Sequence, residues 1–171
     1  AHIDDCSLAR FVHEQVVDDA DEVILREGRR VRGGVETEAA EAGIVFLTHS
    51  ETSTGVLSRV AEVRQAIDNA GHPALFMVDT ISSLACMDFR HDEWGVDVAV
   101  SSSQKGLMLP PGLSFTAISE KALRAAESSR FAKSYWRWDE MLKANEKGFF
   151  PYTPATNLLF GLWESIQMLE E

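Results

Sequence analysis

Four short runs of apolar residues, each followed by polar residues, constrain the fold of this chain more than any other feature. They are IVFL (44–47), ALFMVD (74–79), VDVAVS (96–101) and LSFTAIS (113–119). A continuous apolar run of this length is typical of a strand buried on both faces of a parallel sheet. Helical patterns alternate with these runs, so the sequence predicts an α/β fold with a mostly parallel sheet flanked by helices.

The predicted helices have recognisable ends. Val60, Val63 and Ile67 follow helical spacing, and Gly71 and Pro73 should stop that helix. Ser119 is a predicted cap for a helix reaching about residue 125, and a last amphipathic helix is expected over 154–169.

Residues 1–43 are less regular. We expect a helical lead-in with helical spacing over 7–24, a basic loop over 26–34 and a short helix closed by Gly43. The chain begins without Met and ends within a predicted helix, so we expect it to be a piece of a longer protein.

Composition excludes several classes of protein. Asp plus Glu outnumber Lys plus Arg by 27 to 16 in 171 residues, which disfavours nucleic acid and anionic membranes as partners. No apolar run is long enough to cross a membrane. The two cysteines are far apart in sequence, so no disulfide framework is predicted and the cytoplasm is favoured. The five histidines lack the spacing of metal ligands, so no metal site is expected.

Polar clusters follow three of the predicted strands, at 48–54, 79–83 and 101–105. Because ligands of open α/β sheets bind at the carboxyl ends of the strands, this edge is the predicted site. Asp79 closes one strand, where a carboxylate is partly desolvated and needs a partner. Lys105 follows another, between small and apolar flanks that would make it a nucleophile for carbonyls.

Each of the two residues has a simpler alternative. Asp79 is equally compatible with a helix cap or a salt bridge to arginine, and Lys105 with an anion-binding or surface lysine. Together, however, an amine and a carboxylate at neighbouring strand ends can hold one aromatic ring between them. Pyridoxal 5′-phosphate (PLP) requires that pair, since the amine binds its aldehyde and the carboxylate keeps its pyridine nitrogen protonated.

Four segments resemble the class V aminotransferases of PLP fold type I. They are HSETSTGVL (49–57), VDTISSL (78–84), DEWGVDVAVSSSQKGLMLPPGLSF (92–115) and GFFPYTPATNLL (148–159). The resemblance points to the serine–glyoxylate and alanine–glyoxylate branch and covers the chain from about residue 44 to its end. It implies that 44–171 is the central part of the PLP-binding large domain. The family's glycine-rich phosphate loop and its small domain, with the arginine that binds the substrate carboxylate, have no counterpart here.

The resemblance also implies roles for individual residues. Lys105 matches the Schiff-base lysine, Asp79 the carboxylate on the pyridine nitrogen, and Gln104 a residue near the phosphate. Thr52 matches a residue that contacts the phenolic oxygen of the ring, and Thr153 matches one that reaches the cofactor phosphate of the partner subunit in a homodimer. Ile81 matches a residue packed on one face of the ring. It lies two positions after Asp79, so its side chain would point the same way if the strand continued. Phe150 stands where the family often has a tyrosine, so Tyr152 is a candidate substitute.

The implied activity is a PLP-dependent transfer of an amino group from serine or alanine to glyoxylate, with Lys105 as the general base and acid. Small amino acids and 2-oxo acids are then the substrates, in the full-length parent and not in this chain alone. Two alternatives stay open: a noncatalytic truncated α/β module, and another class V PLP enzyme such as a lyase or desulfurase. His49 is predicted to be structural, and Tyr135, Trp136 and Trp138 are predicted to form a docking surface or, alternatively, a ligand platform.

Overall fold

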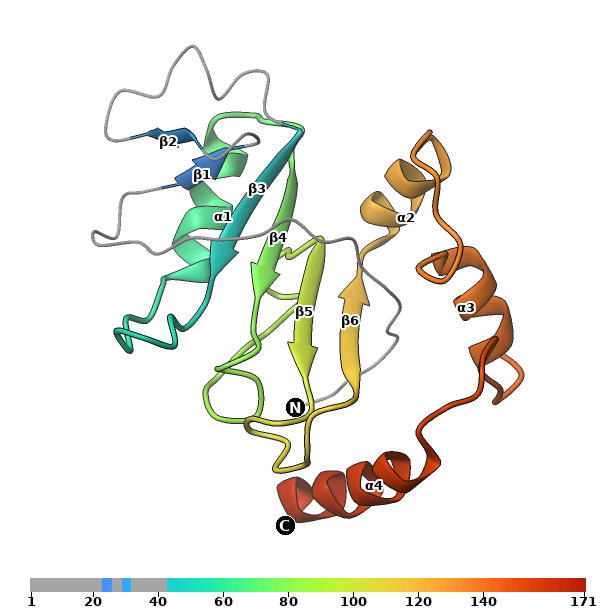
Figure 1. Ribbon diagram of the computed structural model, residues 1–171. Coiled ribbons are helices and arrows are strands. Elements are labelled where there is room, and N and C mark those ends of the chain that lie inside the picture. The colour runs from blue at the N-terminus through green and yellow to red at the C-terminus, as the bar shows by residue number, and fades with distance from the viewer. Residues whose placement is uncertain (1–22, 26–28, 32–42) are drawn as a thin grey trace.

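The computed structural model describes residues 23–25, 29–31 and 43–171, and within them a sheet has helices packed on it (Figure 1). Its strands lie in the order β2-β1-β3-β4-β5-β6. They are β1 (Val23–Leu25), β2 (Arg29–Val31), β3 (Ile44–Thr48), β4 (Leu75–Asp79), β5 (Val98–Ser102) and β6 (Ser114–Ile118). The helices are α1 (Val60–Asn69), α2 (Glu120–Glu127), α3 (Trp138–Asn145) and α4 (Thr156–Glu170).

The predicted α/β fold is confirmed, and the parallel strands form the centre of the sheet. β3 pairs in parallel with β4, and β4 with β5. β6 runs antiparallel to β5 because residues 103–113 connect them as a loop, without the crossover helix that a parallel partner needs. β1 is antiparallel to both β2 and β3 at the other edge.

The N-terminal expectation differs from the structure where the two can be compared. Val23–Leu25 and Arg29–Val31 are strands of an antiparallel pair, whereas the sequence suggested helix and loop. β1 pairs with β3, and the hydrogen bonds of this pairing cannot be predicted from the local sequence pattern. The other residues expected in the lead-in lie outside the described part. The structure also contains α3, over the segment that was predicted only as an aromatic stretch.

The sheet has an apolar core on each face, because successive side chains of a strand point to opposite sides. One cluster joins Val45, Phe76 and Val78 to Val60 and Ile67 of α1. The other cluster joins Met77 and Val98 to Ala122 of α2, with Trp138 packed against it. The continuous apolar runs of the sequence therefore reflect burial on both faces.

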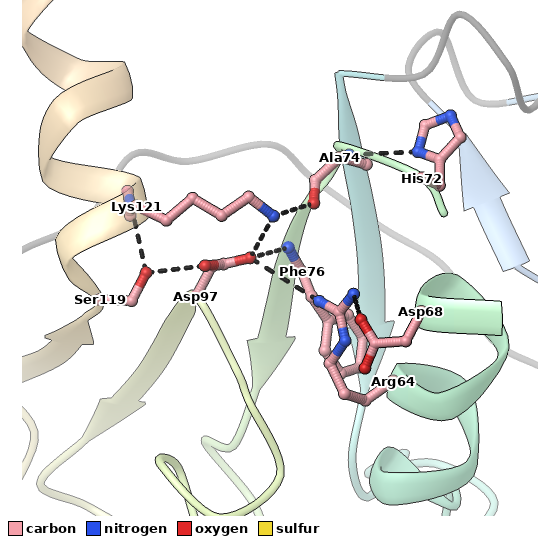
Figure 2. A network of polar contacts seen from close by, with 9 residues as sticks. Arg64, Asp68, His72, Ala74, Phe76, Asp97, Ser119 and Lys121 are labelled. Carbon is pink, nitrogen blue, oxygen red and sulfur yellow. Dashed lines mark hydrogen bonds and ion pairs between the residues drawn. The ribbon is translucent and has the colours of Figure 1, made fainter. Parts of the chain in front are cut away.

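Asp97 lies at the amino end of β5 in a network of polar contacts (Figure 2). The residue is 4% exposed. Its Oδ1 accepts a hydrogen bond from Ser119 Oγ at 2.7 Å, and its Oδ2 accepts from Phe76 N at 2.9 Å and Lys121 Nζ at 3.1 Å. Arg64 lies at 4.0 Å from Oδ2. This network ties β4, β5, α1 and the start of α2 together.

Ser119 belongs to both this network and the predicted helix end. Its hydroxyl accepts a hydrogen bond from Ala122 N at 3.2 Å, which confirms it as the N-cap of α2. Among the helices of the described residues, none combines the length and apolar character that a membrane crossing requires.

Candidate active site at the carboxyl edge of the sheet

The carboxyl ends of β3 and β4 are level with each other, and β5 extends two residues further at the same edge of the sheet. Thr48 pairs with Asp79, and Asp79 pairs with Val100. His49 N continues the pattern by donating a hydrogen bond to the Asp79 carbonyl at 2.9 Å. The polar residues that follow the three strands therefore start from one edge, as the sequence predicts for a parallel sheet.

The segment that follows Asp79 touches the segment that carries Lys105. A Cβ added to Gly106 would lie 2.1 Å from the Leu84 carbonyl oxygen and 2.8 Å from Cys86 Sγ. No residue other than glycine fits such an approach without a backbone shift. Lys105 therefore sits one residue from a contact with the loop that begins at Asp79.

The loop after β3 joins the same edge through hydroxyl groups. Thr52 Oγ1 and Ser82 Oγ share a hydrogen bond of 2.7 Å. Deeper in the edge, His49 Nδ1 and Ser83 Oγ are hydrogen-bonded at 2.9 Å. Three segments distant in sequence thus meet beside Asp79.

Asp79 is half-buried and has few partners. Its Oδ1 accepts a hydrogen bond from Ile81 N at 2.8 Å, a local turn contact. Desolvation raises the pKa of Asp79 above its ordinary value; the Ile81 hydrogen bond opposes this effect, and the charge of Glu51 adds to it. No cation within the described residues forms an ion pair with this carboxylate. Of the simpler alternatives, the salt bridge to arginine is therefore not found there.

Lys105 differs in its surroundings from the sequence expectation. Its side chain is exposed, whereas the apolar flanks suggested apolar walls around it. The flanking residues Leu107 and Leu109 are instead buried beneath the loop, at 6% and 9% exposure. The apolar flanks anchor the backbone of the loop and leave the amine at the surface.

The remaining predicted site residues lie in different settings. Gln104 precedes Lys105 and is exposed. β4 ends at Asp79 and a turn starts at Ile81, so the strand alternation that was expected to align these two side chains does not apply. Thr153 is exposed between α3 and α4, and within the described residues no hydrogen bond links it to the other five.

Two sets of contacts at the edge could not be predicted from the sequence: the ring packing around His49 and the hydrogen bonds of Ser103. His49 is 3% exposed and packs against Phe89 and Trp94, with ring centroids 5.6 and 6.0 Å away. Desolvation lowers the pKa of His49, although the charge of Asp88 opposes this. This burial agrees with the structural role predicted for His49. Ser103 forms hydrogen bonds within the loop that carries Lys105.

The aromatic residues near α3 divide into two groups. Trp138 is partly buried and packs against the core cluster that contains Met77 and Ala122. Tyr135 and Trp136 are 56% and 69% exposed. The ring of Tyr152 packs on that of Tyr135, with centroids 4.8 Å apart.

The residues at this edge fit the cofactor that the sequence suggests. A half-buried carboxylate whose negative charge is disfavoured by burial is stabilised by a cationic partner, and a protonated pyridine nitrogen is such a partner. An exposed primary amine on an adjacent loop is available to an aldehyde. The described residues contain no group of three or more His, Cys, Asp or Glu side chains arranged for a metal ion.

Comparisons with known proteins agree with this chemistry. A family model described as Aminotransferase class-V matches residues 35–171. Serine–glyoxylate aminotransferase of Hyphomicrobium methylovorum is 53% identical over 131 residues, covering 75% of this chain and 32% of that protein. L-aspartate–glyoxylate aminotransferase of Paracoccus denitrificans is 47% identical over 129 residues, covering 75% and 33%.

A solved structure of an aminotransferase is also similar to this chain in its fold. Alanine–glyoxylate aminotransferase of Nostoc sp. superposes with a TM-score of 0.65 at 31% identity, covering 74% of this chain and 34% of that one. The chain thus spans about a third of the length of the curated relatives it matches. Sequence and structure together show that the chain belongs to the class V aminotransferase family.

Proposed function

We propose that this chain is the cofactor-binding core of a PLP-dependent aminotransferase, in which Lys105 binds the cofactor covalently and Asp79 pairs with its pyridine nitrogen. The observation that carries the proposal is the contact between Gly106 and the Leu84 carbonyl. This contact joins the Lys105 loop to the segment that starts at Asp79, a half-buried carboxylate whose pKa is raised by burial. When bound, PLP supplies an electron sink for the α-carbon of an amino acid.

The protein's own groups then have distinct tasks. Asp79 would hold its negative charge against the ring nitrogen, and two opposite charges about 4 Å apart attract each other by about 4 kcal/mol at an effective dielectric of about 20. Lys105 Nζ would act as the general base that takes the proton from the substrate α-carbon, and as the acid that returns it. From the family resemblance, Thr52 would hold the phenolic oxygen of the ring, Ile81 would cover one ring face, and Gln104 would bind near the phosphate.

The substrates proposed for the whole protein are glyoxylate as acceptor and serine or alanine as donor. The three relatives described above all have glyoxylate in their names, whereas their named donors are serine, aspartate and alanine. The acceptor is thus the more strongly supported half of the reaction. Glycine is the expected product, with hydroxypyruvate or pyruvate.

We also propose that the whole protein is a cytoplasmic homodimer. Thr153 would reach the cofactor phosphate of the partner subunit, and the exposed rings of Tyr135, Trp136 and Tyr152 offer an apolar surface near that segment. Light scattering of the full-length protein tests the dimer, because a monomer at micromolar concentration contradicts it.

Borohydride reduction of the full-length protein with PLP, followed by peptide mapping, tests the site. We expect a pyridoxyl label on Lys105 and its loss in Lys105→Ala. A label on another residue contradicts the assignment, and no label at all favours a noncatalytic module. Formation of glycine from glyoxylate and serine or alanine, without sulfide release from cysteine, separates the aminotransferase from a desulfurase.

A further inference from the structure

Helix α4 lies against the loop that carries Lys105, which comprises residues 103–113 and is called the Lys105 loop below. Figure 1 shows α4 beyond the carboxyl ends of β4 and β5, beside the connection from β5 to β6. Two small residues one turn apart, Gly161 and Ser165, contribute to the contact, as does Leu158, which lies against Gly112 of the loop. A Cβ on Gly161 would lie 2.9 Å from Leu109 Cδ2, so the helix backbone approaches the loop closely.

Ser165 adds a directed contact to this packing. Its Oγ donates a hydrogen bond of 2.6 Å to the carbonyl oxygen of Leu107, two residues after Lys105. A serine within a helix commonly bonds a carbonyl of the preceding turn, but this one bonds a carbonyl 58 positions away. Ser165 is 4% exposed, and it is the buried residue of α4.

The Lys105 loop is also tied internally, by Ser103. The Ser103 hydroxyl donates to the Pro110 carbonyl at 2.8 Å and accepts from Leu113 N at 3.2 Å. The Ser103 carbonyl accepts from Leu109 N at 3.1 Å. These bonds close the loop on itself, whereas Ser165 attaches it to a different element of the fold.

The backbone between Lys105 and Leu109 is strained. Met108 has a φ of 60°, which is unfavourable for a residue with a side chain, and its N–H donates to the Lys105 carbonyl at 2.8 Å. Such a conformation persists only where the surroundings hold it. The Ser165 hydroxyl, on the adjacent Leu107 carbonyl, is one of the groups that hold it.

We propose that Ser165 is a positioning residue for Lys105: by holding the Leu107 carbonyl it fixes the backbone from which the lysine side chain reaches the cofactor. The inference rests on the proposed function, because it assigns Lys105 its covalent role. Ser165 itself contacts neither cofactor nor substrate in this scheme. Its effect passes through two residues of backbone.

The test compares Ser165→Ala with Ser128→Ala in the full-length protein. Ser128 is a matched control, since its hydroxyl also donates to a carbonyl, that of Ala125 at 2.9 Å, but at the exposed end of α2. Without PLP, we expect amide exchange at Met108 and Leu109 to become about tenfold faster in Ser165→Ala, as the loss of one hydrogen bond implies. Exchange in β4 should not change.

With PLP, Ser165→Ala should lower kcat about tenfold with an unchanged KM for the amino acid, and should shift the pH at which the absorbance of the bound cofactor titrates. Ser128→Ala should match the wild type in all measurements. Should Ser165→Ala fold poorly, Ser165→Cys, with a weaker donor of similar size, is expected to show intermediate exchange.

The outcomes separate this inference from the proposed function. If Ser165→Ala has the same amide exchange at Met108 and Leu109 and the same kcat as the wild type, the role of Ser165 is overturned. This holds even if Lys105 carries the pyridoxyl label. Conversely, absence of a label on Lys105 in the wild type overturns the proposed function. Faster loop exchange would in that case show only that Ser165 holds the loop, and the positioning role would be overturned as well.

Discussion

An aspartate lies at each end of the central strands, and the two carboxylates differ in how many partners they have. Asp97, at the amino end, uses both carboxylate oxygens for partners from three other elements, β4, α1 and the start of α2. Asp79, at the carboxyl end, accepts one local hydrogen bond and has a pKa raised by burial. A buried charge is tolerated when it is paired. The comparison indicates that the amino end is built for stability, whereas the carboxyl end retains binding capacity.

Asp79→Asn should produce the largest effect, on activity. Loss of about 4 kcal/mol from the pairing with the ring nitrogen corresponds to a fall in kcat on the order of a thousandfold. Steady-state assays of glycine formation by the full-length protein measure it. A variant with more than a tenth of wild-type activity would contradict the role of Asp79.

The same variant should not lose stability at neutral pH. The folded-state pKa of Asp79 is raised above its unfolded value, so the ionised carboxylate disfavours the folded state at pH values above both. Asn keeps an oxygen for Ile81 N and removes the charge. Urea unfolding of the cofactor-free protein at pH 7 should therefore show equal or greater stability, and the difference should shrink as the pH falls towards the unfolded pKa.

Asp97→Ala should give the opposite result. Removing the buried carboxylate leaves Phe76 N without its acceptor and Lys121 with only the Ala74 carbonyl, which costs about 3 kcal/mol. Urea unfolding measures the loss, and labelling of Lys105 per folded molecule should remain. If Asp97→Ala instead abolished labelling in protein that is still folded, the division between the two ends would be wrong.

Gly106→Ala should disturb the carboxyl end without touching the amino end. Its Cβ would meet the Leu84 carbonyl at 2.1 Å, so the backbone must shift, at a cost of about 1–3 kcal/mol, and Lys105 must move with it. Gly43→Ala is the control, because a Cβ there meets nothing within 4 Å and its backbone is not left-handed. We expect lower unfolding midpoints and slower borohydride-fixed labelling for Gly106→Ala alone.

His49 should contribute the smallest effect, a dependence of stability on acid pH. Burial lowers the folded-state pKa of His49 below the ordinary histidine value of about 6.5, so the unfolded chain takes up a proton first as the pH falls through that value. Stability is then lost below that pH. In His49→Asn, the stability difference between pH 8 and pH 5.5 should be smaller than in the wild type. An identical difference would mean that His49 does not titrate in this way.

Local pattern was sufficient for the elements whose burial is uniform. The apolar runs predict β3 to β6 to within one or two residues, and Ser119 is the N-cap of α2 as expected. The direction of β6 and the existence of β1 and β2 depend on pairing between distant segments. The network of Asp97 was not predicted, because its partners Phe76, Ser119 and Lys121 are distant from it in sequence.

The sequence by itself determined that this is an α/β chain with polar residues at three strand ends, and its motifs identified the family, because residue type and spacing are local properties. Tertiary structure alone decided which polar groups meet. It brings Gly106 to Leu84, joins Thr52 to Ser82, and sets Ser165 against Leu107 across 58 positions. Such contacts depend on how helices and loops pack at the end of the sheet, and packing at long range leaves no periodic signal in the chain.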